Sequence, residues 1–219
     1  MRYFWNFNIV FAQIDLLLNG LLLGLLLAVA SLMIGVLLGL FMAFLATSKH
    51  LWLRVVSRFY VTLLRNTPLL VLIFIVYFGL PDIYVRLGKN ESFVFALSLY
   101  AGAYMTEVFR AGLEAIPKGI IEAGQAIGLT PLQICWNIQL PIMFKNVLPS
   151  LGNYLISLFK DTSLAASITI PELTYSAKKI NTLTFRVFEV WLVTAALYIV
   201  ACYLMAFILR RVERRFAIQ

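Results

Sequence analysis

The most constraining feature of the sequence is an uncharged run of 33 residues from Leu16 to Ser48. A helix of that length measures about 50 Å, whereas the hydrocarbon core of a bilayer is about 30 Å thick. The run also exceeds the core of a signal peptide, which has about 7 to 15 residues. Composition agrees, because 62% of the residues are hydrophobic and 13% are charged, against roughly 25% charged in soluble domains. We therefore predict a polytopic membrane protein, and we exclude a disordered chain, a secreted disulfide scaffold and a cytosolic enzyme.

Four further apolar segments follow this run. We predict an all-α membrane protein that forms a single domain over residues 1–219, with five transmembrane helices at 16–46, 59–80, 92–114, 142–161 and 187–209. Small residues let helices approach closely in lipid. We therefore expect the first span to pack against its neighbours through Gly20, Gly24, Gly35 and Gly39.

The basic residues predict the orientation, because segments on the cytoplasmic side carry more Lys and Arg. With the N-terminus outside, the cytoplasmic segments hold Lys49, Arg54, Arg58, Arg65, Arg110, Lys118, Lys145, Arg210, Arg211, Arg214 and Arg215. The outer segments then hold the smaller set, which is Arg2, Arg86, Lys89, Lys178, Lys179 and Arg186. We predict a periplasmic N-terminus and a cytoplasmic C-terminus, although the outer loop at 167–186 is itself basic.

The net charge of +8 does not indicate a nucleic-acid partner. The basic residues lie between apolar runs and form no dense stripe on a soluble face. Cys135 and Cys202 lie far apart without a CxxC spacing, so we expect neither a disulfide nor a metal site. We also expect no cofactor, and His50 has no visible partner in the sequence.

The predicted cytoplasmic loop at 117–140 carries strong local signals. Pro117 suits the start of a short helix, and Gly128 suits the left-handed position after it. Thr130 and Pro131 then suit the N-cap and first turn of a second helix, which Pro141 should end while opening the fourth span. We predict a helix–Gly–helix projection. It is either the docking surface for a partner or a surface hairpin without one.

Several motifs resemble those of a known family. The loop sequence Glu122-Ala123-Gly124, followed by Gly128 and then Ile138-Gln139-Leu140-Pro141, resembles the "EAA" loop of ABC importer permeases, with Gly124 where alanine is usual. Residues 65–70, 104–112, 160–164 and 212–215 resemble segments of the branch that takes up polar amino acids. Ile120 and Ile142-Met143 depart from the pattern of that branch.

The resemblance implies a bacterial inner-membrane importer for amino acids. Such an importer has two permeases, identical or similar, an ATP-binding cassette ATPase dimer, and a periplasmic or lipid-anchored solute-binding protein. The resemblance implies that the coupling residues are Glu122, Ala123, Gly124, Gly128, Ile138, Leu140 and Pro141. The sequence contains no GxxxxGK loop, so the chain itself is not expected to hydrolyse ATP by that route.

Ionisable residues in spans are candidates for function, because charges are costly in lipid. Glu107 and Arg110 share one helix face and form either a structural pair or a substrate contact. Asp161 is a candidate partner for a cationic substrate group. Lys160, Thr162 and Ser163 complete the predicted pathway, and the alternative is a Lys-Asp pair at the membrane rim. Glu189 is expected at the interface.

Two other functions remain to be compared with a permease. A secondary transporter would need no ATPase, but such proteins are usually longer with a visible internal repeat. An intramembrane enzyme would need a set of catalytic groups in its spans. Glu107 and Asp161 lie on different spans with no motif around them, which argues against catalysis.

Overall fold

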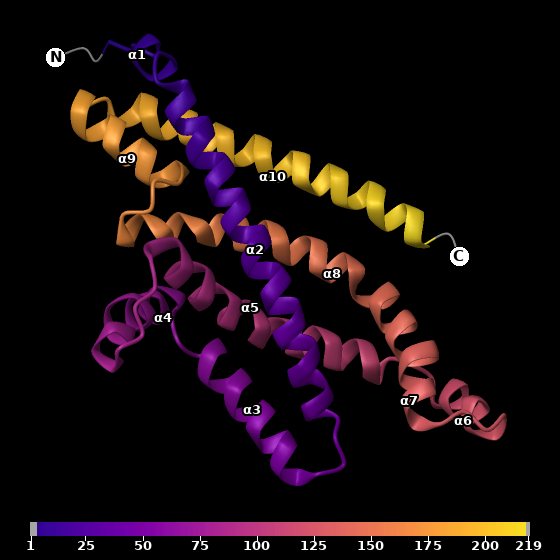
Figure 1. Cartoon of the computed structure of the whole chain (residues 1–219). Coiled ribbons are helices and arrows are strands. Elements are labelled where there is room, and N and C mark those ends of the chain that lie inside the picture. The colour runs from indigo at the N-terminus through magenta and orange to yellow at the C-terminus, as the bar shows by residue number, and fades with distance from the viewer. Residues whose placement is uncertain (1–3, 218–219) are drawn as a thin grey trace.

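A computed structural model describes residues 4–217, with side chains described as far as Arg214, and its regular secondary structure over that range consists of helices joined by short turns and loops (Figure 1). Arg2 lies outside the described residues, as does the side chain of Arg215. The α-helices are α1 Asn8–Phe11, α2 Ile14–Ala46, α3 Leu51–Arg65, α4 Leu69–Phe74, α5 Lys89–Glu114, α6 Lys118–Ala126, α7 Pro131–Ile134, α8 Leu140–Asp161, α9 Leu173–Thr184 and α10 Val187–Ala217. Short π- and 3₁₀-helical segments extend several of them.

The helices form an elongated bundle in which α2 crosses the other long helices (Figure 1). The segments α1 and α9 lie at one end, and α6 and α7 lie at the opposite end. We refer to these as the α9 end and the α6 end. The α9 end and the α6 end each carry a polar region, and the two lie far apart in the bundle.

The predicted glycine contacts of α2 are confirmed. Gly20, Gly24, Gly35 and Gly39 are all buried. A Cβ added at Gly20 would lie 2.8 Å from the backbone of Leu173, and one at Gly35 would lie 2.6 Å from the Cβ of Ala101. These distances leave no room for a side chain, so the four glycines set the approach of α2 to α5 and to the start of α9.

Three helices are long and apolar enough to cross a membrane, namely α2, α5 and α10 as far as Arg214. Helix α8 has nearly the bounds predicted for the fourth span. It is less apolar, because it carries Lys145, Asn146 and Asn153. The fifth predicted span continues beyond residue 209 as part of α10.

The prediction of one continuous helix over 59–80 is wrong. Helix α3 already begins at Leu51, and a bend of 102° separates Leu51–Arg65 from Leu69–Ile83. Pro68 has no N–H to continue the helix, and its backbone is extended with ψ of 132°, as proline favours. The Asn66 and Thr67 side chains donate to the carbonyls of Thr62 and Leu63. These bonds satisfy the last turn of α3 where it breaks.

The prediction that Pro141 ends a helix is also wrong. The chain is helical without interruption from Pro131 to Asp161, and a π-helical turn at Cys135–Gln139 precedes Pro141. A proline removes one backbone hydrogen bond and clashes with the preceding turn. A wider π turn before the proline absorbs that irregularity, so the helix continues through it.

The segment 167–186, predicted as a loop, contains the 12-residue helix α9. The buried Glu172 side chain caps this helix by accepting from the N–H groups of Tyr175 at 2.7 Å and Thr174 at 2.8 Å. The Tyr198 hydroxyl of α10 donates to the same carboxylate at 3.2 Å. Glu189, expected at the interface, is instead fully buried and accepts from the N–H of Asn6 at 3.0 Å. We call Glu172, Thr174, Tyr198, Arg186 and Glu189 the outer polar group.

Candidate functional site

Polar residues line one face of α5 at helical spacing. Tyr100, Tyr104, Glu107 and Glu114 follow one another at intervals of four, three and seven residues, which places them on one side of the helix. Helices α3 and α8 both pack against α5. The site therefore lies between α3, α5 and α8.

Three tyrosines form its centre. The Tyr104 ring lies 5.0 Å from the Tyr100 ring and 5.4 Å from the Tyr154 ring on α8. The Tyr100 hydroxyl donates to the Tyr104 hydroxyl at 3.2 Å. The Tyr154 hydroxyl is buried and has no hydrogen-bond partner among the described residues. A buried hydroxyl without a partner is costly, and a ligand could bond this atom only if the surrounding side chains moved.

Asp161 follows Tyr154 by seven residues on α8, which places the two on the same side of that helix. Its side chain is half-buried. The other predicted pathway residues near it differ in burial: Lys160 is exposed and Ser163 is half-buried. Thr162 is fully buried, and its hydroxyl donates to the Phe159 carbonyl at 2.6 Å.

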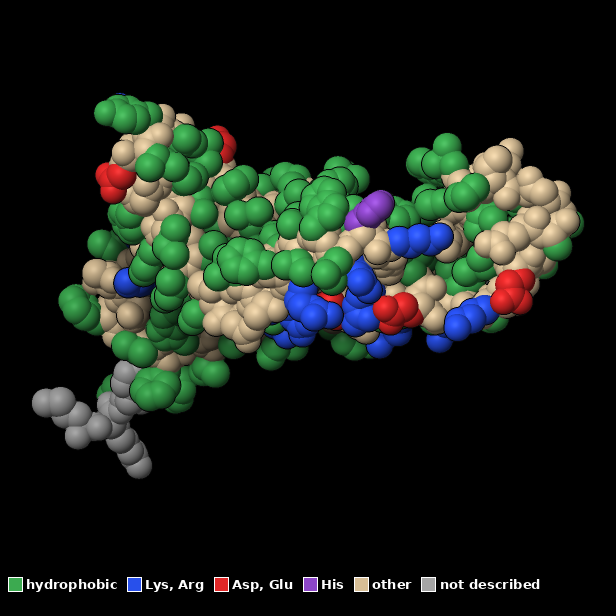
Figure 2. Space-filling model, turned by 90° about the horizontal axis from the view of Figure 1, so that it is seen from below, with side chains coloured by type: hydrophobic (Ala, Val, Ile, Leu, Met, Phe, Trp, Pro, Cys, Tyr) green, Lys and Arg blue, Asp and Glu red, His purple; other side chains and the backbone are tan. Residues whose placement is uncertain are grey.

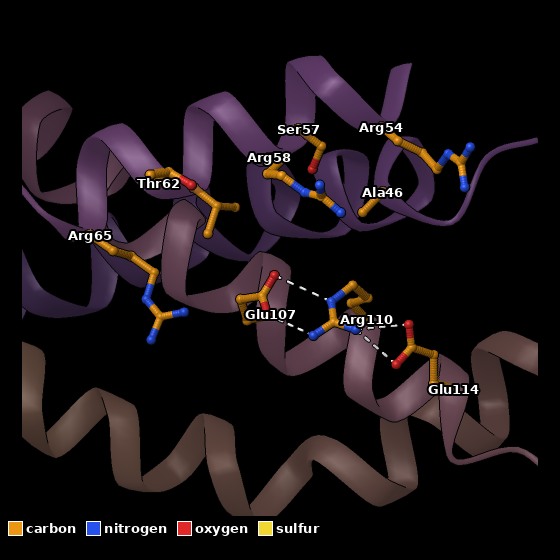
Figure 3. Close-up of a pocket in the computed structure, with 10 residues that line it drawn as sticks. Ala46, Arg54, Ser57, Arg58, Thr62, Arg65, Glu107, Arg110 and Glu114 are labelled. Carbon is orange, nitrogen blue, oxygen red and sulfur yellow. Dashed lines mark hydrogen bonds and ion pairs between the residues drawn. The ribbon is translucent and has the colours of Figure 1, made fainter. Parts of the chain in front are cut away.

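Arg65 and the Glu107–Arg110–Glu114 group continue the site toward the α6 end. The Arg65 guanidinium lies over the Tyr104 ring at 4.9 Å, a cation–π arrangement. Arg110 binds Glu107 at 2.7 Å and Glu114 at 2.8 Å. Figure 3 shows this group on α5, opposite the arginines of α3. The predicted pairing of Glu107 with Arg110 is therefore present in the structure.

Cavities follow the same path. One of about 510 Å³ lies between α3 and α5, and one of about 580 Å³ lies between α5 and α8. A smaller one of about 250 Å³ lies between α3 and Tyr104. All three share Arg65. Arg65 and Glu107 thus line open space, whereas Tyr154 and Asp161 line none of these three cavities.

The segment 117–140 forms the projection at the α6 end. Pro117 precedes α6, Gly128 has φ of +83°, and Thr130 caps α7 through a reciprocal pair of hydrogen bonds with Gln133. These three local features agree with the sequence. We call this segment the α6–α7 projection.

The coupling residues predicted on the projection divide into two sets. Gly124 is buried, and a Cβ there would lie 2.8 Å from the Ile138 Cδ1 atom, so a larger residue requires the end of that side chain to shift. Leu140 is buried, whereas Glu122, Ala123 and Pro141 are exposed. Four large apolar side chains are also exposed: Ile120, Ile127, Leu132 and Trp136. Burial raises the pKa of the Cys135 thiol.

Some site residues were not predicted. Tyr100, Tyr104 and Tyr154 were overlooked, although the four-residue spacing from Tyr100 to Tyr104 on the face that leads to Glu107 could have indicated the first two. Arg65 was assigned only to membrane orientation. No group of side chains that could hold a metal ion exists among the residues that the structure describes.

Comparisons with known proteins agree with this geometry. The profile of a family described as the inner membrane component of binding-protein-dependent transport systems matches residues 35–218. The chain is 33% identical to the glutamine transport system permease protein GlnP of Escherichia coli over 220 residues, with 100% of both chains covered. It is 32% identical to the probable amino-acid ABC transporter permease protein YckA of Bacillus subtilis over 216 residues, covering 99% of this chain and 96% of YckA.

Solved structures agree with the fold. The crystal structure of an amino acid ABC transporter with histidines superimposes with a TM-score of 0.89 at 32% identity, covering 97% of this chain and 100% of that chain. The MetNI methionine ABC transporter superimposes with a TM-score of 0.80 at 20% identity, covering 94% and 98%. At that identity the second similarity concerns the fold alone.

Proposed function

The chain belongs to the family of inner membrane components of binding-protein-dependent transport systems, and we propose that it is the permease subunit of an ATP-driven importer of amino acids. Two relatives that match nearly its whole length carry names of amino-acid permeases. The cavities along α5, which share Arg65, provide space of suitable size. We place the protein in a bacterial inner membrane with five spans, α3 and α4 together forming a broken second span.

The pathway residues suit a zwitterion. Asp161 accepts the α-amino group or a cationic side chain, and the unpaired hydroxyl of Tyr154, two turns earlier on α8, bonds a polar substrate atom. Arg65, with no carboxylate partner given by the structure, receives the α-carboxylate. Lys160 and Ser163 lie near the entrance. Thr162 supports the end of α8 rather than the substrate, because its hydroxyl already donates to Phe159.

Glu107 and Arg110 serve as a gate below this site. Both side chains are about one-third exposed, so their ion pair can exchange partners at small cost. When α3 moves toward α5, Arg110 keeps Glu114 while Glu107 exchanges Arg110 for Arg65. Such an exchange keeps every charge compensated while the route opens alternately to each side.

The α6–α7 projection couples the gate to a separate ATPase. It faces the cytoplasm in the orientation predicted from Lys and Arg, with the N-terminus periplasmic. Its exposed Ile127, Leu132 and Trp136 suit a hydrophobic groove, and Glu122 makes a charge-assisted contact at the rim. Gly128 supplies the turn that joins the two helices. Because Pro131–Asp161 is one continuous helix, movement of the projection is transmitted directly to Asp161.

The other subunits follow from this role. A second permease, identical or similar, completes the pathway, and an ATP-binding cassette dimer hydrolyses ATP. A solute-binding protein, periplasmic or lipid-anchored, delivers the amino acid to the α9 end. The permease itself catalyses no reaction.

The Tyr154 hydroxyl, which is buried and has no hydrogen-bond partner among the described residues, is the observation that supports this function best. The test is uptake of labelled amino acids into proteoliposomes that contain the whole complex, with and without internal ATP. Uptake that needs ATP supports the proposal, whereas equal uptake without ATP contradicts it and favours a secondary transporter.

Asp161→Asn tests the site within the same assay. It keeps the shape of the side chain and removes its charge, and we expect uptake to fall about tenfold or more, since about 1.4 kcal/mol is a factor of ten. Lys160→Met is the matched control, because Lys160 is exposed, and we expect it to lose far less. Near-normal uptake by Asp161→Asn contradicts a substrate contact at this residue.

A further inference from the structure

Helix α3 has three distinct faces. Ser57, Val61 and Leu64 are buried against the bundle. The apolar residues Leu51, Trp52, Val55, Val56, Phe59 and Leu63 are exposed on a second face. Arg54, Arg58 and Arg65 occupy a strip between these two faces, since each is separated from the next by four or seven residues. This pattern directs an apolar face toward lipid and a basic strip along the edge of the bundle.

Among the residues that the structure describes, the arginines of α3 have no acidic partner within ion-pair distance. Glu107 and Glu114 are the acids that line the cavity of about 510 Å³, and both bind Arg110. The structure gives no ion pair for Arg54 or Arg58. A second copy of the chain would bring the same excess of positive charge. The counter-charge must therefore come from a different molecule.

Position along the helix separates Arg54 and Arg58 from Arg65. With a rise of about 1.5 Å per residue, they lie about 5 and about 11 Å from the start of α3 at Leu51, whereas Arg65 lies about 21 Å away. The start of α3 follows Lys49 and His50, at a membrane surface. Arg54 and Arg58 are thus at the depth of phospholipid headgroups, and Arg65, over Tyr104, is not.

We propose that Arg54 and Arg58 form a binding site for a phosphate group, and that its occupant is an anionic phospholipid whose acyl chains lie along the apolar face of α3. Figure 3 shows both side chains beside the cavity between α3 and α5. Figure 2 shows Lys and Arg side chains gathered next to the chain's single histidine, with apolar surface around them. Two guanidinium groups four residues apart present a fork of donors to one phosphate.

The occupied site has a consequence for α3. The single negative charge of a bound phosphodiester offsets about half of the charge of the two arginines opposite Arg110, which weakens the repulsion between α3 and α5. The lipid therefore stabilises the packing of α3 on α5. The assignment of this site to the inner leaflet rests on the proposed function, which orients the start of α3 toward the cytoplasm. The binding of an anionic lipid does not rest on it.

Trp52 on the apolar face of α3 provides the measurement. The purified complex in detergent is titrated with phosphatidylglycerol carrying brominated acyl chains, and quenching of Trp52 fluorescence is obtained by subtraction of a Trp52→Phe variant. We expect the midpoint for brominated phosphatidylglycerol to be about tenfold lower than for brominated phosphatidylcholine. In Arg54→Gln/Arg58→Gln the two midpoints should become equal. Arg210→Gln, a control at another basic position, should keep the difference.

Several results would overturn the proposal. Equal midpoints for the two lipids in the unmodified chain mean that the arginines bind no anionic headgroup. Displacement of the lipid by glycerol 3-phosphate at similar concentration means that the site takes free phosphate esters. Absence of quenching by either lipid means that a protein subunit covers the apolar face. Survival of the lipid preference in Arg54→Gln/Arg58→Gln means that the site lies elsewhere.

Discussion

Glu172, at the α9 end, has no exposed surface and accepts hydrogen bonds from Thr174, Tyr175 and Tyr198. Glu107, beside the cavities, has 34% of its side chain exposed and binds one arginine of its own helix. The first carboxylate joins α9 to α10 next to Gly20 and Gly24 of α2, whereas the second joins two turns of α5. Losing a partner in the buried group leaves an unpaired polar atom, but in the exposed group water replaces it.

This difference divides the molecule into a part that holds the frame and a part that can rearrange. The outer polar group fixes the ends of α2, α9 and α10. The Glu107–Arg110–Glu114 group and the α6–α7 projection lie where partners can exchange. The predictions below test this division.

The largest effect is expected at Glu172. Glu172→Ala removes the cap of α9 and leaves two buried N–H groups unpaired, which should cost about 2 to 4 kcal/mol. We expect little folded protein in detergent, measured by size-exclusion chromatography after heating. Asp82→Asn, at an exposed acid, is the control and should behave as the unmodified chain. If Glu172→Ala unfolds at the same temperature as that control, the outer polar group does not hold the frame.

The second effect concerns the α6–α7 projection. Gly128→Asp places a residue with a Cβ at φ of +83°, which costs roughly 1 kcal/mol or more, and a Cβ there would meet nothing within 4 Å. Folding should therefore be almost unchanged while the angle between α6 and α7 shifts. We expect ATP-dependent uptake to fall at least tenfold, with Gly119→Asp, also in open space, as the control. Full uptake by Gly128→Asp would exclude the projection from coupling.

Local chemistry explains which parts of the fold could be predicted. Pro117, Gly128 and Thr130 act on their own neighbours, so the turn between α6 and α7 follows from sequence alone. The glycine contacts of α2 were also predictable, since small residues four apart in a membrane helix usually allow close packing against a neighbouring helix. The partners that those glycines meet could not be predicted.

Features that depend on distant residues were not predicted. Glu172 resembles any polar loop residue until α9 folds and Tyr198 approaches from α10. The sequence Asn66-Thr67-Pro68 indicates a break, but the angle of 102° depends on packing against α5. The tyrosine cluster combines α5 and α8, and it becomes visible only when Tyr154 is placed beside Tyr104. Sequence therefore predicted Asp161 without its aromatic neighbours.

A third prediction compares the two ends of the molecule by labelling of Cys135 in a Cys202→Ser background. In the proposed orientation an impermeant maleimide should not reach Cys135 in intact cells, and it should react in inverted vesicles. The raised pKa of this thiol lowers its thiolate fraction at neutral pH, so the reaction should be several-fold slower than with an exposed thiol. The rate should increase about tenfold per pH unit below that pKa. Labelling in intact cells would reverse the assignment of the α6 end to the cytoplasm.

The smallest effect is expected at Arg110, and it tests the comparison between Glu172 and Glu107 directly. Arg110→Gln removes both ion pairs of the group. Glu107 has 34% and Glu114 59% of the side chain exposed, so water can solvate both carboxylates, and the loss of stability should be no more than about 1 kcal/mol.

Arg186→Gln is the matched control at the α9 end, since its partner Glu189 has no exposed surface. Removing one charged contact of a buried carboxylate should cost more than removing the exposed pairs, because water cannot replace it there. Thermal unfolding of the two variants under the same conditions measures the ratio. If Arg110→Gln is the more destabilising of the two, the group beside the cavities holds the frame as firmly as the outer polar group, and exchange of partners cannot operate the gate.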